Sequence, residues 1–434
     1  MELDPQARQL NQVIQSSHPA VLDLLSARGK AIYFPKQGIL SQSAEANGKE
    51  INATVGIALE DDGGPVCLPS VAKNINMEPA SVFPYAPSPG KADIRKLWKE
   101  MLLEKNPSLQ GKPFSLPVVC AALTHGLSIA GYLFCDEGDR VLLPDLYWEN
   151  YGLIFTHAYD AALDTFPTYD GNGGFNVEGL RAKLRVPAPR GKRVVLLNFP
   201  NNPSGYTPLV AEARDIVAAL GEAAERGDKL VVIVDDAYFG LVFEEGVCTH
   251  SLFADLCDLH PNLLAVKVDG ATKEDYAWGL RVGFLTFGVK GGTAALYEAM
   301  EAKTGGAIRG NISNTSTPAQ SLLVKSWTSG EYHAEKRQKF DLLKQRYDTV
   351  KAILAAHPEY RERFAPLPFN SGYFMCIRPQ VDAEKLRQKL LADYSTGTIN
   401  FGGILRLAFS ATPTGKLPKL FDNIWRAAGE LAGK

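Results

Sequence analysis

The stretch RVVLLNFPNNPSGYTPLVAEARDIVAALGEAAERGDKLVVIVDDAYFG, residues 193–240, predicts the fold class of the protein. It opens with an apolar run rich in β-branched residues, 193–199, and ends just after a second run, 230–236. The segment between them has the period of a helix that begins near Thr207 and ends near Gly227. Two such strands joined by a helix form the crossover unit of a parallel sheet buried on both faces. We therefore predict an α/β fold.

A third run of the same type, 263–270, is predicted to extend this sheet. After about residue 330 the pattern changes: 333–357 has the period of a long helix, followed by strands near 372–377 and 404–409 and a last helix. We expect the chain to divide into an N-terminal arm with part of a small domain (1–65), a large ligand-binding domain (66–325) and a C-terminal small domain (326–434).

Composition excludes several classes of protein. The chain has 434 residues, 45% hydrophobic and 22% charged, with a formal net charge of −2, and it lacks the long basic run typical of nucleic-acid-binding proteins. Six cysteines are scattered without a CxxC pair, so we expect neither a disulfide framework nor a metal site. The N-terminus does not resemble a signal peptide, and no apolar run reaches the roughly 18 residues of a membrane span. We expect a cytoplasmic protein with no membrane or nucleic-acid partner.

The stretch GATKEDYAWGLRVGF, residues 270–284, holds a candidate nucleophile. Lys273 directly follows the third predicted strand, at the end where α/β folds bind ligands. Arg281 stands eight residues later. A lysine near a cation in a partly dry pocket has a lowered pKa and can attack a carbonyl to form an imine. A solvent-exposed loop lysine is the alternative.

Polar side chains also end the two neighbouring strands. Asn202 lies in a Pro/Asn turn after the first strand and is placed to donate a hydrogen bond to a ring oxygen. Asp235 ends the second strand, where it either caps a helix or holds a cationic ring nitrogen. Tyr238, three residues further on, is expected to reach the same ligand with its hydroxyl.

A helix is predicted to open at Thr124-His125-Gly126, and the N–H groups and hydroxyl of such a terminus make a phosphate site. Trp148 follows in a loop, either packed in the core or stacked on a planar ring. Together these motifs supply a phosphate site, a stacking ring, partners for a phenolic oxygen and a pyridinium, and an amine for an aldehyde. Pyridoxal 5′-phosphate needs this set of groups.

With these motifs in this order over residues 50–410, the sequence resembles the fold-type I, class I/II aminotransferases, and most closely the aspartate and aromatic aminotransferases. The resemblance implies a three-layer α/β/α fold with a mostly parallel central sheet and a smaller α+β domain. It implies a ping-pong transfer of an amino group through a Schiff base. The donor would be aspartate, glutamate or an aromatic amino acid, and the acceptor a 2-oxo acid such as 2-oxoglutarate.

The resemblance also assigns roles at the cofactor. Lys273 would bind it covalently and move the substrate proton, Asp235 would face the pyridine nitrogen, Asn202 and Tyr238 the ring oxygen, and Trp148 would stack on the ring. The phosphate would be bound by a further set: Thr124, His125, Thr272, Arg281 and, from the neighbouring subunit of a homodimer with shared active sites, Tyr85 in FPYAPSPG (83–90).

Two arginines and a glycine are implied at the substrate, together with Trp148 and Asn202. Arg406 in GGILRLAFSAT matches the arginine that binds the substrate α-carboxylate, with a strand-edge salt bridge as the alternative. Gly56, in INATVGIALEDDGG (51–64), matches the loop that closes over the substrate. Arg309 in AIRGNISN matches the arginine lent across the dimer interface to a dicarboxylate side chain, with a surface arginine as the alternative.

The sequence departs from the family pattern at several positions. Gly270 stands where many relatives place a serine on the phosphate, which removes one hydroxyl contact. Ala122 and Leu123 replace a Ser-Gly pair. Tyr151 stands where aspartate aminotransferases often keep a histidine behind the aspartate, and Tyr147 precedes the tryptophan.

Two other functions are compatible with the same fold. A C–S lyase or another β-eliminating enzyme would use the same cofactor, but it has no need of a dicarboxylate clamp such as Arg309. A cofactor-sensing transcription regulator would carry an added basic DNA-binding domain, and we expect none in this chain because the N-terminal segment is short and acidic.

Overall fold

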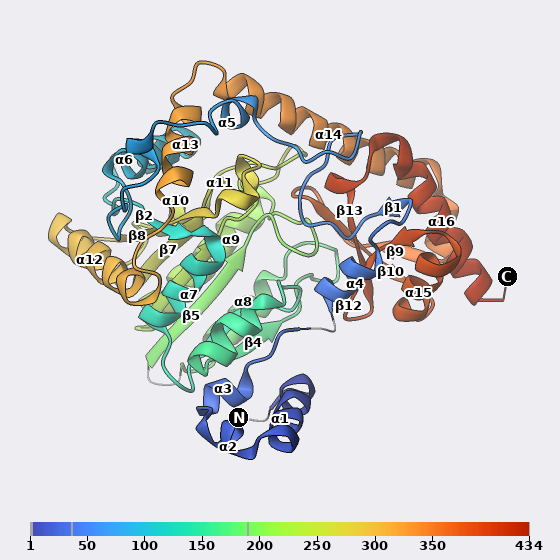
Figure 1. The fold of residues 1–434 in the computed structure, drawn as a ribbon, viewed down its shortest axis with the longest axis horizontal. Coiled ribbons are helices and arrows are strands. Elements are labelled where there is room, and N and C mark those ends of the chain that lie inside the picture. The colour runs from blue at the N-terminus through green and yellow to red at the C-terminus, as the bar shows by residue number, and fades with distance from the viewer. Residues whose placement is uncertain (1–2, 36–37, 189–190, 434) are drawn as a thin grey trace.

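The computed structural model describes residues 3–35, 38–188 and 191–433. Its largest sheet has seven strands in the order β2-β8-β7-β6-β5-β3-β4 (Figure 1). Along the chain these strands are β2 Val118–Ala121, β3 Arg140–Pro144, β4 Ala162–Phe166, β5 Lys192–Asn198, β6 Lys229–Asp235, β7 Leu263–Asp269 and β8 Val282–Val289. All neighbouring pairs are parallel except those made by β8, which is antiparallel to both β2 and β7.

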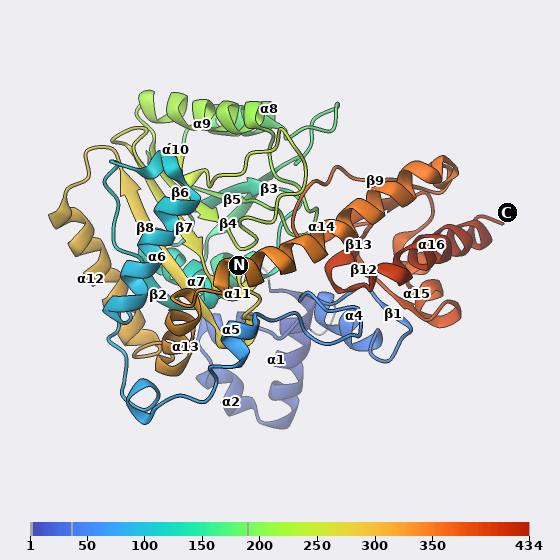
Figure 2. The ribbon, with the colours of Figure 1, turned by 90° about the horizontal axis from the view of Figure 1, so that it is seen from above.

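Helices cover both faces of this sheet. The helices are α1 Pro5–Ser17, α2 Pro19–Leu24, α3 Ala27–Ala31, α4 Ile39–Glu45, α5 Pro69–Ala72, α6 Ala92–Lys105, α7 Ala122–Phe134, α8 Val177–Arg185, α9 Val210–Glu225, α10 Phe253–Leu256, α11 Ala271–Glu274, α12 Ala294–Asn311, α13 Thr317–Trp327, α14 Tyr332–Ala356, α15 Ala383–Asp393 and α16 Leu417–Leu431. Figure 2 shows α8 and α9 on one side of the sheet and α7 on the other. The predicted three-layer α/β/α fold is therefore confirmed.

A second, smaller α+β unit lies beside the large sheet. Its antiparallel strands, in the order β12-β13-β10-β9, are β9 Phe364–Pro366, β10 Phe374–Pro379, β12 Ile399–Phe401 and β13 Ile404–Ala408. Near the other end of the chain, β1 (Ile51–Asn52) pairs in parallel with β11 (Thr396–Gly397). The division of the chain at residues 65 and 325 stays a prediction.

The predicted core elements lie within three residues of their observed positions. The three apolar runs are β5, β6 and β7, whose interior residues, apart from the half-buried Leu264, are buried because both faces of the sheet are covered. The helix predicted from Thr207 to Gly227 is α9, and the long C-terminal helix is α14. The antiparallel β8 was not predicted. Among the described residues, no helix is long and apolar enough to span a membrane.

The loop after β5 bridges the two sheets through Gly205. Its φ is +72°, a left-handed conformation that glycine adopts without strain. Its carbonyl accepts hydrogen bonds from the backbone N–H groups of Asn370 and Ser371, each at 2.9 Å. A Cβ atom at this position would lie 1.9 Å from the carbonyl oxygen of Phe374, so only glycine fits. This close approach sets the place of Asn202 relative to the small sheet.

We expect Gly205→Ala to destabilise the protein more strongly than Gly240→Ala. Both glycines have positive φ, so each substitution adds about 1–2 kcal/mol of left-handed strain. Only the Gly205 substitution adds a clash, because a Cβ at Gly240 would meet nothing within 4 Å. Urea denaturation of both variants checks this, and equal denaturation midpoints would contradict the bridging contact.

Candidate active site

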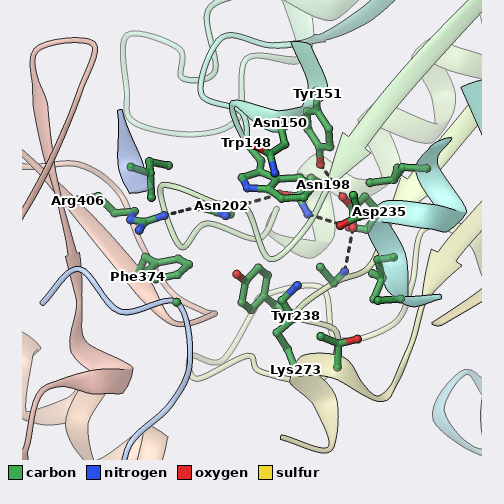
Figure 3. Close-up of a pocket in the computed structure, with 18 of the residues that line it drawn as sticks. Trp148, Asn150, Tyr151, Asn198, Asn202, Asp235, Tyr238, Lys273, Phe374 and Arg406 are labelled. Atoms are coloured by element: carbon green, nitrogen blue, oxygen red, sulfur yellow. Dashed lines mark hydrogen bonds between the residues drawn. The ribbon is translucent and has the colours of Figure 1, made fainter. Parts of the chain in front are cut away.

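The main candidate site is a cavity of about 410 Å³ where the carboxyl ends of β5, β6 and β7 face β10 and β13 of the small unit (Figure 3). Most of the residues predicted from the sequence line it: Gly56, Thr124, Trp148, Asn202, Asp235, Tyr238, Thr272, Lys273, Arg281 and Arg406. The sheet topology explains the convergence, because parallel neighbouring strands end at the same edge.

Lys273 lies in the single-turn helix α11, which directly follows β7. Its amine is 5.3 Å from the centroid of the Tyr238 ring, and the two side chains lie next to each other in Figure 3. Removal from water lowers the pKa of Lys273 to about 8; nearby Asp235 opposes this effect and Arg281 adds to it. Near neutral pH a larger fraction of this amine is therefore neutral, and nucleophilic, than in an ordinary lysine.

Asp235 ends β6 with a 3% exposed side chain. The hydroxyl of Tyr151 donates to its Oδ2 at 2.6 Å, and the N–H of Ala237 donates to its Oδ1 at 3.2 Å. Burial raises the pKa of Asp235 to about 6, although the Tyr151 hydrogen bond and the charge of Lys273 pull it down. A buried carboxylate held this way favours a cationic partner. Tyr151 thus lies behind Asp235, at the position where the sequence resemblance implied a histidine.

Arg406, in β13, lies at the opposite end of the cavity and is 3% exposed. Its Nη1 donates to Oδ1 of Asn202 at 3.2 Å, and its Nη2 donates to the carbonyl of Thr54 at 3.3 Å. The guanidinium carbon is 4.3 Å from the centroid of the Phe374 ring. Its Nε is buried and has no hydrogen-bond partner in the described structure. The two hydrogen bonds of this buried guanidinium are long, and its Nε donor has no partner among the described residues. Such a group fits an anionic ligand such as a carboxylate.

Asn202 is itself oriented by its neighbour Asn198. The side-chain oxygen of Asn198 accepts a hydrogen bond from the backbone N–H of Asn202 at 2.9 Å. The amide nitrogen of Asn198 donates to the backbone carbonyl of Asp235, also at 2.9 Å. Asn198 therefore ties the ends of β5 and β6 together, beneath the two polar groups that face the cavity.

A phosphate fits the cavity at the start of α7. The N-cap residue of this 13-residue helix is Ala121, which has no side chain that could cap it, so the N–H groups of the first turn after Ala121 are open to an anion. Thr124, Thr272 and the exposed Arg281 lie at the same end. The hydroxyl of Thr272 donates to the carbonyl of Val282 at 3.3 Å.

The missing serine at Gly270 has a steric cause. A Cβ at Gly270 would lie 2.6 Å from the Cα of Gly283 and 2.6 Å from the carbonyl oxygen of Val282. The backbones of the two strands approach each other too closely for a side chain. The packing at the end of β7 against β8 therefore leaves no room for a serine at this position.

Three predicted residues do not line the cavity of this chain. Nδ1 of His125 accepts a hydrogen bond from the backbone N–H of Ala121, four residues earlier, at 3.1 Å. Tyr85 is 90% exposed, and Arg309, in α12, is exposed and donates to Oγ of Ser313 at 2.7 Å. The roles of His125 at the cofactor, and of Tyr85 and Arg309 across a dimer interface, stay predictions.

Several lining residues were not predicted as site residues. They come from the N-terminal segment, from the loop after β3, and from the ends of β5 and the small sheet: Ile39, Leu40, Ser43, Thr54, Asn150, Tyr151, Asn198 and Phe374. Asn198 carried a usable signal, since it is a polar residue that ends an apolar strand. The residues of α4 carried none, because only the tertiary fold brings this helix to the cavity.

Comparison with known proteins agrees with this geometry. The family model described as aminotransferase class I and II matches residues 49–424. A bifunctional aspartate aminotransferase and glutamate/aspartate-prephenate aminotransferase from Petunia hybrida is 24% identical over 352 residues, covering 80% of this chain and 69% of that protein. A probable aspartate/prephenate aminotransferase from Aquifex aeolicus is 30% identical over 201 residues, but the match covers only 46% of this chain and 48% of that protein.

Solved structures share the fold over almost the whole chain. A crystal structure of an aminotransferase from Anaerococcus prevotii superposes with a TM-score of 0.81 at 24% identity, covering 93% of this chain and 98% of that one. An aromatic amino acid aminotransferase from Burkholderia cenocepacia gives a TM-score of 0.73 at 20% identity, covering 91% of this chain and 97% of that one.

We expect Tyr151→Phe to destabilise the protein more at pH 8 than at pH 5. The Tyr151 hydroxyl stabilises the ionised form of Asp235, so its loss raises the pKa of Asp235 further. Below pH 6 the carboxyl is largely protonated and the bond matters less. Above it the loss costs about 1.5–3 kcal/mol. Urea denaturation at the two pH values measures the difference.

Tyr147→Phe is the matched control. Its ring lies 6.4 Å from that of Tyr151, and no hydrogen bond between its hydroxyl and Asp235 is found in the described structure. We expect a small effect that does not depend on pH. Equal effects of the two substitutions at both pH values would contradict the role of Tyr151.

Proposed function

Since the chain belongs to the class I and II aminotransferase family, we propose that it is a pyridoxal 5′-phosphate-dependent transaminase. It would move an amino group from an amino acid to a 2-oxo acid in two half-reactions. One observation carries this proposal. The Lys273 amine and the buried carboxylate of Asp235 line the same cavity, and the charge of each affects the pKa of the other.

The residues of the cavity fit this cofactor at each of its functional groups. The uncapped start of α7, with Thr124, Thr272 and Arg281, would hold the phosphate. Asp235 would hold a protonated ring nitrogen, since a nearby cation stabilises the charge of a buried carboxylate. When bound, the cofactor carries the amino group and withdraws electrons from the substrate carbon.

The other ring contacts come from three further residues. Asn202 and Tyr238 would donate hydrogen bonds to the ring oxygen, and Trp148 would stack on the ring. Burial raises the pKa of Tyr238, so its hydroxyl stays protonated and remains a donor.

Protein side chains would control the movement of the substrate proton. Lys273, with a pKa near 8, would take the proton from the substrate Cα and give a proton back later in the same half-reaction. Arg406 would bind the α-carboxylate in bidentate fashion, because Phe374 and the Thr54 carbonyl fix the plane of its guanidinium. A fixed carboxylate holds the Cα–H bond in one direction, and this selects loss of the proton over loss of the carboxylate.

We propose a narrower set of amino donors than membership of the family alone implies. Aspartate and glutamate are proposed as donors on the strength of Arg309, which would reach the site from the partner in a homodimer. Aromatic amino acids are proposed beside them, because a pocket shared with Trp148, Ile39 and Leu40 offers apolar surface to a ring. A 2-oxo acid such as 2-oxoglutarate would accept the amino group.

We expect single amino acids to convert the bound cofactor from its aldehyde form to pyridoxamine phosphate, as followed by absorbance. Lys273→Ala should slow this half-reaction by about 10²–10⁴-fold, the usual contribution of a general base. Release of ammonia and pyruvate from a β-substituted amino acid, without pyridoxamine phosphate, would instead identify a β-eliminating enzyme. No conversion by any amino acid would refute the transaminase.

We expect Arg309→Ala to raise KM for aspartate and glutamate by about 10- to 100-fold, the worth of a lost charged hydrogen bond. KM for phenylalanine should stay the same, because its side chain offers no carboxylate. Arg214→Ala, an exposed arginine of α9, is the control. A parallel loss for all three donors would remove Arg309 from side-chain recognition.

A further inference from the structure

We propose that Lys336 and Lys339 of α14 are positioning residues, which fix the segment of Lys273 and the substrate-side segment 51–64 relative to each other. The inference rests on the proposed function, because it concerns the placement of the proton-transferring lysine against the bound substrate. It begins with a sequence feature that the predicted site leaves unused. Lys273 is followed directly by Glu274-Asp275, and Gly56 is followed four residues later by Glu60-Asp61.

The first acid pair is bound by the start of α14. The amine of Lys336 lies 2.7 Å from Oε1 of Glu274 and 3.0 Å from Oδ1 of Asp275. The hydroxyl of Tyr332 donates to the same Asp275 oxygen at 2.7 Å. Both carboxylates are almost fully buried, at 3% and 0% exposure, so their partners decide where they lie.

Two other helices close around the same pair. The amine of Lys105, in α6, lies 2.8 Å from Oε1 of Glu274, and Nε1 of Trp327, in α13, donates to Oδ2 of Asp275 at 3.0 Å. Burial alone raises the pKa of Glu274, but Lys105 and Lys336 outweigh it and hold the pKa below its usual range. Glu274 is therefore held in its ionised form, and its contacts together with those of Asp275 anchor the segment after Lys273.

The second acid pair is bound further along α14. The amine of Lys339 lies 2.8 Å from Oε1 of Glu60, and Nη2 of Arg346 lies 2.8 Å from Oδ1 of Asp61. Arg346 is completely buried and also donates to the carbonyl of Ser410. That carbonyl accepts a further hydrogen bond from the N–H of Leu59 at 3.1 Å.

The segment held in this way forms the substrate side of the cavity. Its Thr54 carbonyl accepts the bond from Arg406, and Gly56 lines the cavity beside it. Residues 336 and 346 of a continuous α-helix stand about 15 Å apart along its axis. A single rigid element therefore spans from the lysine segment to the substrate segment, as Figure 1 shows for α14.

Such a link matters because transfer of a proton needs close alignment. A displacement of about 1 Å at a reacting group costs about 10²-fold in rate. Loss of the Lys336 contacts should displace Lys273 and lower kcat. Loss of the Lys339 contact should displace the substrate segment and raise KM. Ion pairs that only stabilise the fold would not divide their effects in this way.

The experiment compares three methionine substitutions in one helix, Lys336→Met, Lys339→Met and Lys344→Met. Lys344 pairs within α14 with Asp348, 2.8 Å away, so its loss should change neither constant. For each full-length apoprotein, the rate of capture of added pyridoxal 5′-phosphate by Lys273 is followed by absorbance and by borohydride trapping with peptide mapping. Steady-state kcat and KM follow on the reconstituted enzyme.

We expect Lys336→Met to lower both the capture rate and kcat by about 10- to 100-fold, and Lys336→Arg to recover most of both. Lys339→Met should raise KM for the amino donor several-fold and leave the capture rate unchanged. Wild-type values for Lys336→Met, or a fall in kcat without a change in KM for Lys339→Met, would overturn the proposal.

Lys336→Met leaves two buried carboxylates short of a partner, so thermal unfolding of each variant is measured first. If this variant does not fold, Tyr332→Phe decides, because it removes the 2.7 Å bond to Asp275 and the 3.1 Å bond that Lys336 donates to the same hydroxyl, and leaves both carboxylates paired with Lys336. It should lower the capture rate several-fold at unchanged KM, and a wild-type rate would overturn the proposal. Failure of the proposed function appears differently, as a wild-type protein that captures the cofactor and transaminates no amino acid.

Discussion

The electrostatic balance between Asp235 and Lys273 sets the conditions for the rest of the cavity. Each group alone would lose its charge on burial, because removal from water raises the pKa of the carboxyl and lowers that of the amine. Each also supports the charge of the other. Tyr151 adds to the carboxylate side and Arg281 opposes the ammonium, so both groups titrate within a few units of neutrality. Two groups that titrate near neutral pH are suited to moving protons.

The scaffold needed for this balance is dictated by the parallel sheet. Because β5, β6 and β7 end at one edge, Asn198, Asp235 and the helix that carries Lys273 are neighbours although they are far apart in the chain. The small sheet then supplies Arg406 from the other side, and the glycine-dependent approach of the loop after β5 to β10 sets the gap between the two. The cavity lies where the large, mostly parallel sheet meets the small antiparallel sheet, and both contribute residues to it.

Much of the site could be predicted because its residues end apolar strands. Asp235 and Lys273 stand at such ends, and the period of the runs placed those ends within a residue or two. Other features depend on contacts between distant segments. No local pattern joins Tyr151 to Asp235, 84 positions later, or Lys336 to Glu274, 62 positions earlier. The antiparallel direction of β8 was equally hidden, since an apolar run has no direction. The helix α4 reaches the cavity only through the folding of the N-terminal segment.

The close approach of Gly270 to Gly283 limits which side chain position 270 can carry. A serine at Gly270 would strike the neighbouring strand, so Gly270→Ser alone would not give a well-packed protein. The strands would have to separate first, and until they carried the new side chain that separation would leave an empty space between them. A hydroxyl-bearing side chain at this position therefore requires a compensating change in the neighbouring strand. Under the proposed function, the contacts to the phosphate are then left to the start of α7, to Thr272 and to Arg281.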